Sequence, residues 1–217
     1  MNKKKKRIIY DIVKYLKGKY TDNSAGHGWL HFERVWKMAK RLSRGQKLDT
    51  FVAEVSALLH DVDDYKFKKE GEDDLANTKK ILNKYNLDSE ILGKIYDIAS
   101  HVSYKGGKAD DRQKTLEGKI VQDADRLDVI GAVGIARVFA YGGNKNRPIY
   151  DLKIKPRDMV SFDEYKIASP SINHFYEKIL LLKDRLNTLQ AKKIAENRHK
   201  FVEEFLNQFW DEIKGNE

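Results

Sequence analysis

The sequence predicts an all-α protein, a compact bundle of about eight helices. Apolar residues recur at three- and four-residue intervals along most of the 217 residues, the spacing that places them on one face of a helix. The chain has only three prolines, all of them between residues 148 and 170. The long segment 141–169 contains glycine, asparagine and proline, residues that favour turns, and we expect it to be a loop.

Eight segments have helical periodicity, and they follow one another along the chain. They are residues 4–18, 27–43, 50–61, 72–85, 88–102, 112–140, 170–186 and 188–212. Asp49 and Thr50 suit the start of the third segment, and Asp88 or Ser89 the start of the fifth, because their side-chain oxygens accept hydrogen bonds from free helix amides. We expect residues 1–217 to form a single domain with a core at about 20–150, on which helices 170–212 pack.

The composition excludes several kinds of protein. Without cysteine the chain has neither a disulfide framework nor a thiolate metal site. No apolar run approaches the length of a membrane span, and polar residues interrupt the apolar part of MNKKKKRIIYDIV, which makes it a poor signal peptide. We therefore expect a soluble, cytoplasmic protein.

The net charge favours an anionic partner. The chain has 42 Lys and Arg against 33 Asp and Glu, a formal charge of +9. Nucleic acid, a membrane surface or a phosphorylated small molecule would each complement it. Lysines recur throughout the chain, with a cluster at residues 3–7, so a lysine-rich composition that only aids solubility is the simpler explanation.

Four ionisable residues interrupt the apolar helix faces. His31, in GHGWLHFERVWKMAKRL, begins the apolar stripe of its segment. His60 ends a face of small residues, and Asp61 follows it directly. Asp125, in GKIVQDADRLDVIGAVGIARVF, has apolar neighbours on its own face, where a carboxylate is costly unless it is paired or bound to a cation.

Two imidazoles and two carboxylates from three helices suit a divalent cation. Without thiolate, such a set favours Mn, Fe, Mg or Zn, with open positions for water. Each residue also has a structural interpretation, since a lone histidine on an apolar face is more often a hydrogen-bonded core residue. A His-Asp pair can likewise be an ordinary helix end. The conjunction of the four residues favours the metal site.

The order H…HD…D resembles the HD-domain superfamily of metal-dependent phosphohydrolases. The motifs are HxxxHxxRV ending at residue 35, LLHD at 58–61 and QDADRLD at 122–128, as in small stand-alone bacterial members, and the resemblance covers about residues 20–150. It implies an all-α fold and one divalent ion, manganese first, with Mg, Fe, Ni or Zn as alternatives. The implied metal ligands are His31, His60, Asp61 and Asp125.

Several further roles follow from this resemblance. Asp123 and Asp128 compete with Asp125, but the family places the ligand at the position of Asp125, and Asp128 would hydrogen-bond a ligand from behind. Asp64 is the expected general acid or base, with Asp63 in reserve, although both could be an acidic helix end. The expected substrate contacts are His27, Arg34, Lys66, His101, Lys105 and Arg126. Isolated basic residues are also often plain surface charge.

The resemblance implies hydrolysis of a small nucleotide, most simply a (deoxy)nucleoside triphosphate cleaved to monophosphate and pyrophosphate. The alternatives within the fold are a 5′-nucleotidase or another phosphodiesterase. Alarmone hydrolysis ranks low, because HDVDDYKF departs from the adjacent Glu-Asp pair of those enzymes. From another class, a non-catalytic nucleotide- or nucleic-acid-binding protein is an alternative. Nucleic acid ranks low as a partner because no recognised motif is present, and we expect no membrane partner and a monomer or homodimer.

Overall fold

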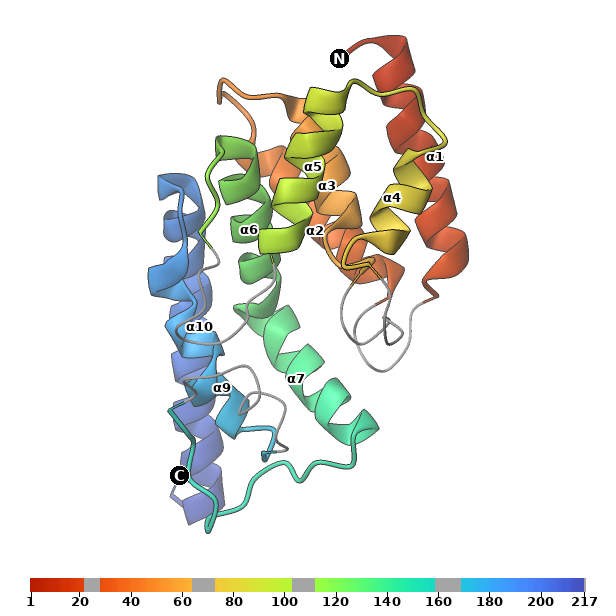
Figure 1. Ribbon diagram of the computed structural model, residues 1–217. Helices are drawn as coiled ribbons and strands as arrows, with labels where there is room; N and C mark the ends of the chain where they lie inside the picture. Colours follow the sequence, from red (N-terminus) through yellow and green to blue (C-terminus); the bar gives the residue numbers. More distant parts are fainter. Residues whose placement is uncertain (22–27, 64–72, 103–111, 159–168, 217) are drawn as a thin grey trace. The chain divides into compact units, whose positions relative to one another are not determined.

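Helices joined by turns and loops make up the structure. It is a computed structural model that describes residues 1–21, 28–63, 73–102, 112–158 and 169–216 (Figure 1). These ranges contain nine α-helices and two short 3-10 helices, and they contain no β-strand. The predicted all-α class is therefore confirmed. No helix in these ranges combines the length and the apolar character needed to cross a membrane.

The described residues form two compact units. The first extends to Asp125 and the second begins at Arg126. The first contains α1 (Lys3–Lys19), α2 (Trp29–Leu42), α3 (Thr50–Leu59), α4 (Ala76–Leu82), α5 (Ser89–His101) and most of α6 (Leu116–Val129). The second contains the end of α6, α7 (Ala132–Asn144), α9 (Asn173–Glu177), η1 (Ile179–Leu181), η2 (Lys183–Arg185) and α10 (Leu189–Lys214). The single domain expected from the sequence stays a prediction.

Helix α3 is the centre of the first unit. It packs against α1, α2 and α5, and every residue from 51 to 59 is buried. Because neighbours cover it on several sides, its sequence TFVAEVSALL is apolar nearly all round. The small residues Ala53, Ser56 and Ala57 have no exposed surface, as close helix packing requires. The end of this helix is therefore surrounded by protein, and the site begins there.

Two predicted helix caps are confirmed. The Asp49 side chain accepts hydrogen bonds from the amides of Phe51 and Val52 at the start of α3. The Asp88 side chain accepts one from the amide of Glu90 at the start of α5. Each cap satisfies amides that have no partner within the helix.

The second unit has its own apolar core. Buried side chains from α9, η1 and α10 form it, and aromatic rings of α7 and α10 pack against it. The buried members are Ile172, Phe175, Ile179, Val202 and Leu206. The aromatic residues Phe205, Phe209 and Trp210 of α10 are thus used for packing within this unit.

Three predicted segment limits were wrong. The segment 112–140 is two helices, because Gly131 has a φ of +100°, a conformation that only glycine adopts easily and that ends α6. The segment 170–186 is one short α-helix followed by 3-10 turns. Helix α7 continues to Asn144, so the irregular segment begins at Lys145 and not at residue 141. Within this part of α7, a side chain at Gly142 would collide with the Ser171 hydroxyl. Residues 159–168 of that segment lie outside the described ranges.

Candidate metal centre

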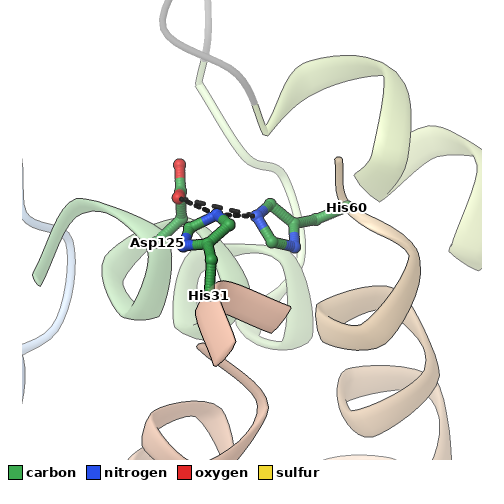
Figure 2. A group of neighbouring side chains, drawn as sticks. All are labelled: His31, His60 and Asp125. Atoms are coloured by element: carbon green, nitrogen blue, oxygen red, sulfur yellow. Dashed lines mark hydrogen bonds and ion pairs between the residues drawn. The ribbon is translucent and has the colours of Figure 1, made fainter. Parts of the chain in front are cut away.

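Three side chains from three separate helical segments point toward one another in the first unit (Figure 2). The Nε2 atoms of His31 and His60 are 3.1 Å apart. The Asp125 Oδ1 atom is 3.7 Å from the first nitrogen and 3.6 Å from the second. Among the described residues this is the group of histidines and acids whose ligand atoms lie close enough together to share one ion.

Local structure explains why these side chains meet. His31 lies in the first turn of α2, and His60 is the residue at which α3 ends. Both are nearly inaccessible to solvent, with exposed fractions of 3% and 5%. The Phe32 ring, which is fully buried, packs edge-on against the His60 ring at a centroid distance of 5.7 Å. The apolar packing leaves the Nε2 atoms of the two rings facing each other.

A backbone hydrogen bond orients the His60 ring. Its Nδ1–H donates to the Ala57 carbonyl oxygen at 2.8 Å, which assigns the proton of the neutral ring to Nδ1. The lone pair of Nε2 then faces His31 and Asp125. A carbonyl partner on the far nitrogen is the usual way in which proteins orient a metal-binding histidine.

The electrostatics of the cluster favour positive charge. Burial alone would lower the pKa of His60, but the hydrogen bond and charge of Asp125, with the charge of Asp61, outweigh it and raise the pKa to about 9. Burial likewise opposes ionisation of Asp125, but His60 and His31 outweigh it and lower the pKa of that carboxyl group. The site therefore holds a carboxylate that attracts either a proton or a metal ion.

Asp61 lies at the edge of this cluster. It is buried, and its Oδ2 atom is 3.9 Å from the Nε2 atom of His31. Asp123, the sequence competitor of Asp125, is fully buried on α6 but is absent from the close group of ligand atoms. The structure therefore brings Asp125 to the histidines and places Asp61 within a short shift of them.

Of the two carboxylates that follow the HD pair, Asp63 is among the described residues. Both oxygens of Asp63 accept backbone hydrogen bonds, from the amide of Asn77 at 2.7 Å and from that of Thr78 at 2.9 Å. Asp63 thus accepts the hydrogen bonds at the start of α4 that an N-cap side chain usually accepts, although the N-cap position itself is Leu75. Asp64 lies outside the described residues, as do His27, Lys66 and Lys105.

His101 ends α5 with one ring nitrogen engaged. Its Nδ1 atom is 2.8 Å from the Asp97 carbonyl oxygen, and its side chain is 41% exposed. Its own carbonyl accepts a hydrogen bond from the buried Gln122 at 3.2 Å. Gln122 was missed from the sequence, although its place three residues before Asp125 puts both on one helix face. It connects the end of α5 to the helix that carries Asp125.

The remaining predicted residues have structural contacts. Arg34 is half-buried on α2. In the second unit, the buried Arg126 donates a hydrogen bond to the Arg185 carbonyl oxygen. The buried carboxylate of Asp128 forms an ion pair with the half-buried Arg137 guanidinium at 2.7 Å. The described contacts of Arg126 and Asp128 are therefore those of residues that hold helices together.

The comparisons with known proteins agree with this geometry. The HD-domain family matches residues 28–130. YpgQ of Bacillus subtilis (strain 168) is 36% identical over 196 residues, 90% of this chain and 88% of YpgQ. A crystal structure of YpgQ in complex with ADP has a TM-score of 0.76 at 30% identity and covers 96% of each chain.

Two further solved structures are similar over nearly their whole length. One, from Lactobacillus plantarum, has a TM-score of 0.88 at 33% identity and covers 100% of both chains. The other is described as an HD-superfamily hydrolase from Bacillus thuringiensis, with a TM-score of 0.73 at 39% identity over 97% of this chain and 98% of that one. The resemblance seen in the motifs is confirmed: this chain belongs to the HD-domain family and is one of its metal-dependent phosphohydrolases.

Proposed function

We propose that the protein hydrolyses small nucleotides, cleaving a (deoxy)nucleoside triphosphate to monophosphate and pyrophosphate. One divalent ion, with manganese as the first candidate, would be held by His31, His60, Asp61 and Asp125. The observation that carries the proposal is the convergence of two imidazole Nε2 atoms and the Asp125 carboxylate on one point.

The donor set fits a divalent ion in three respects. Nitrogen and oxygen ligands without sulfur suit Mn and its neighbours. The Ala57 carbonyl keeps the proton of neutral His60 on Nδ1, so that Nε2 is free to coordinate. Asp61 is 3.9 Å from His31 and would become the fourth ligand through a small side-chain movement. When bound, such an ion lowers the pKa of a water and offsets charge on phosphoryl oxygens.

The residues around the cluster shield it on one side and leave it open to a substrate on another. Phe32 and the buried end of α3 shield the cluster from the core side. The Asp125 side chain keeps 26% of its surface exposed, so the cluster is accessible beside that carboxylate. Because Asp63 is used to cap α4, we assign proton transfer to Asp64. His101, whose Nδ1 is engaged by a carbonyl, would present Nε2 to a phosphate oxygen.

The nucleotide is proposed from a relative. The YpgQ crystal structure contains ADP, and YpgQ shares 36% identity with this chain over most of its length. A nucleotide ligand in that relative supports a nucleotide here, and the +9 charge of the chain is compatible with an anionic substrate. A 5′-nucleotidase would use the same centre and is the second candidate.

A nucleotide panel with added Mn²⁺ tests this proposal. Phosphate and pyrophosphate release should be measured separately for the protein, for Asp125→Asn and for Asp61→Asn. Asp211→Asn, an exposed carboxylate on α10, is the matched control. We expect pyrophosphate from triphosphates, lost in the two site variants and kept in the control. Phosphate from monophosphates would establish a nucleotidase instead, and no release from any nucleotide with metal bound would contradict the proposal.

A further inference from the structure

The excess positive charge of the chain is concentrated on one helix. Of the 42 basic residues, eight lie in the 17 residues of α1, which contain only one of the 33 acidic residues. The rest of the chain therefore has 34 basic and 32 acidic residues, which is nearly balanced. A lysine-rich composition without further purpose would spread the excess evenly, so it does not explain this distribution.

The helix separates its apolar and basic residues onto opposite faces. Ile8, Ile9, Ile12 and Leu16 are buried, and α1 packs against α3. On the opposite face, residues that follow one another at intervals of four and three form one row along the helix. The row consists of Lys3, Arg7, Tyr10, Lys14 and Lys17, with Lys6 beside it, and all six are exposed. We call these six residues the α1 ridge, and it is about 21 Å long at 1.5 Å per residue.

Most cations of the α1 ridge form no ion pair with a described carboxylate. Arg7 pairs with Asp11, the acidic residue of the helix. Lys3, Lys6 and Lys14 have no carboxylate partner among the residues that the structure describes. Cations held along a rigid helix without counter-charges repel one another, and a polyanion would relieve that repulsion.

Aromatic rings lie among these cations. The Arg7 guanidinium is 5.4 Å from the centre of the Tyr10 ring, which is 58% exposed. The Lys17 ammonium is 5.0 Å from the centre of the Trp29 ring, but this ring is buried, so Tyr10 is the ring of the α1 ridge on which a base can stack. Cations with an exposed aromatic ring among them suit single-stranded nucleic acid, where phosphates meet the cations and a base stacks on the ring.

We propose that the α1 ridge docks a single-stranded nucleic acid through its phosphate backbone. A membrane surface fits less well, because a helix that inserts into lipid must present its apolar face, and α1 has buried that face in its own core. A protein partner would need an extended acidic surface without apolar anchors. The ridge is separate from the metal cluster, so this inference does not depend on the proposed hydrolysis.

Fluorescence anisotropy with a labelled oligothymidine, without nucleotide or added metal, tests the ridge. The variant Lys3→Gln/Lys6→Gln/Lys14→Gln removes three unpaired cations. The matched control, Lys192→Gln/Lys193→Gln/Lys214→Gln, removes three exposed lysines from α10 and lowers the net charge equally. Each binding curve should be repeated between 50 and 200 mM salt, and thermal unfolding should establish that both variants are folded.

We expect the α1 variant to bind roughly 100-fold more weakly at about 0.1 M salt. The slope of log affinity against log salt should become less steep by about 2, since each lost phosphate contact removes about 0.7. The α10 variant should bind like the unmodified protein. If both variants bound oligothymidine equally weakly, the affinity would depend on net charge and not on the ridge, which would overturn the proposal. Absence of binding at 50 mM salt, or binding only to vesicles containing phosphatidylglycerol, would overturn it too.

Discussion

The Nε2 atoms of His31 and His60 face each other across 3.1 Å although 29 residues separate them in the chain. At that distance two nitrogens need a proton or a cation between them, because two lone pairs would repel. The carboxylate of Asp125, 3.6 and 3.7 Å away, adds negative charge at the same point. The arrangement therefore favours a bound cation, and its consequences can be measured.

Replacing one of the facing imidazoles should empty the site. We expect His60→Gln to lower Mn²⁺ affinity by on the order of 100-fold or more, since loss even of a group that orients a ligand costs 10- to 100-fold. Metal analysis and calorimetric titration would measure it. His199→Gln, which replaces a buried histidine of the second unit, is the control and should keep its metal. A His60→Gln protein with full metal content would show that the ligands lie elsewhere.

Metal affinity should depend steeply on pH. Because the pKa of His60 in the metal-free protein is about 9, a metal ion must displace its proton throughout the neutral range. We expect affinity to rise about tenfold per pH unit from pH 7 toward 9 and then to level off. Titration calorimetry in buffers of different ionisation enthalpy should detect about one proton released near pH 7.5. A pH-independent affinity would contradict the protonated His60.

The metal-free protein should lose stability in alkali. A pKa raised from 6.5 to about 9 means that the stabilisation from charged His60 is fully present below pH 6.5 and is lost as pH rises through 9. The loss is of the order of 3 kcal/mol in the free energy of unfolding. Urea denaturation of the chelator-treated protein between pH 6 and 9.5 would measure it, and the loss should be absent from His60→Gln.

Asp63 should matter for stability and not for metal binding. Its two oxygens hold the amides of Asn77 and Thr78, so Asp63→Ala should lower the free energy of unfolding by about 0.5–2 kcal/mol, the usual cost of losing a helix cap. Metal content should be unchanged. Asp63→Asn, which keeps one acceptor oxygen, should recover part of the stability. A large loss of metal or activity with normal stability would instead assign Asp63 to the chemistry.

Helix caps are predictable from sequence only where the capping residue is next to its helix. Asp49 and Asp88 were predictable as caps because they directly precede the helices that they cap. Asp63 caps a helix that begins 13 residues later, at Ala76, so its contact depends on the path of the intervening chain. The break between α6 and α7 was missed because apolar periodicity continues through it, and only the positive φ of Gly131 marks it.

By itself the sequence determined the all-α class, the family, and the residues His31, His60 and Asp125 as candidates, because helical periodicity shows where an ionisable side chain interrupts an apolar face. It also determined that α1 is basic. Only the tertiary structure decided that His31, His60 and Asp125 meet at one point while Asp63 is used in a cap. The physical reason is that periodicity defines the faces of single helices, whereas a site depends on distances between atoms from several helices, which packing alone sets.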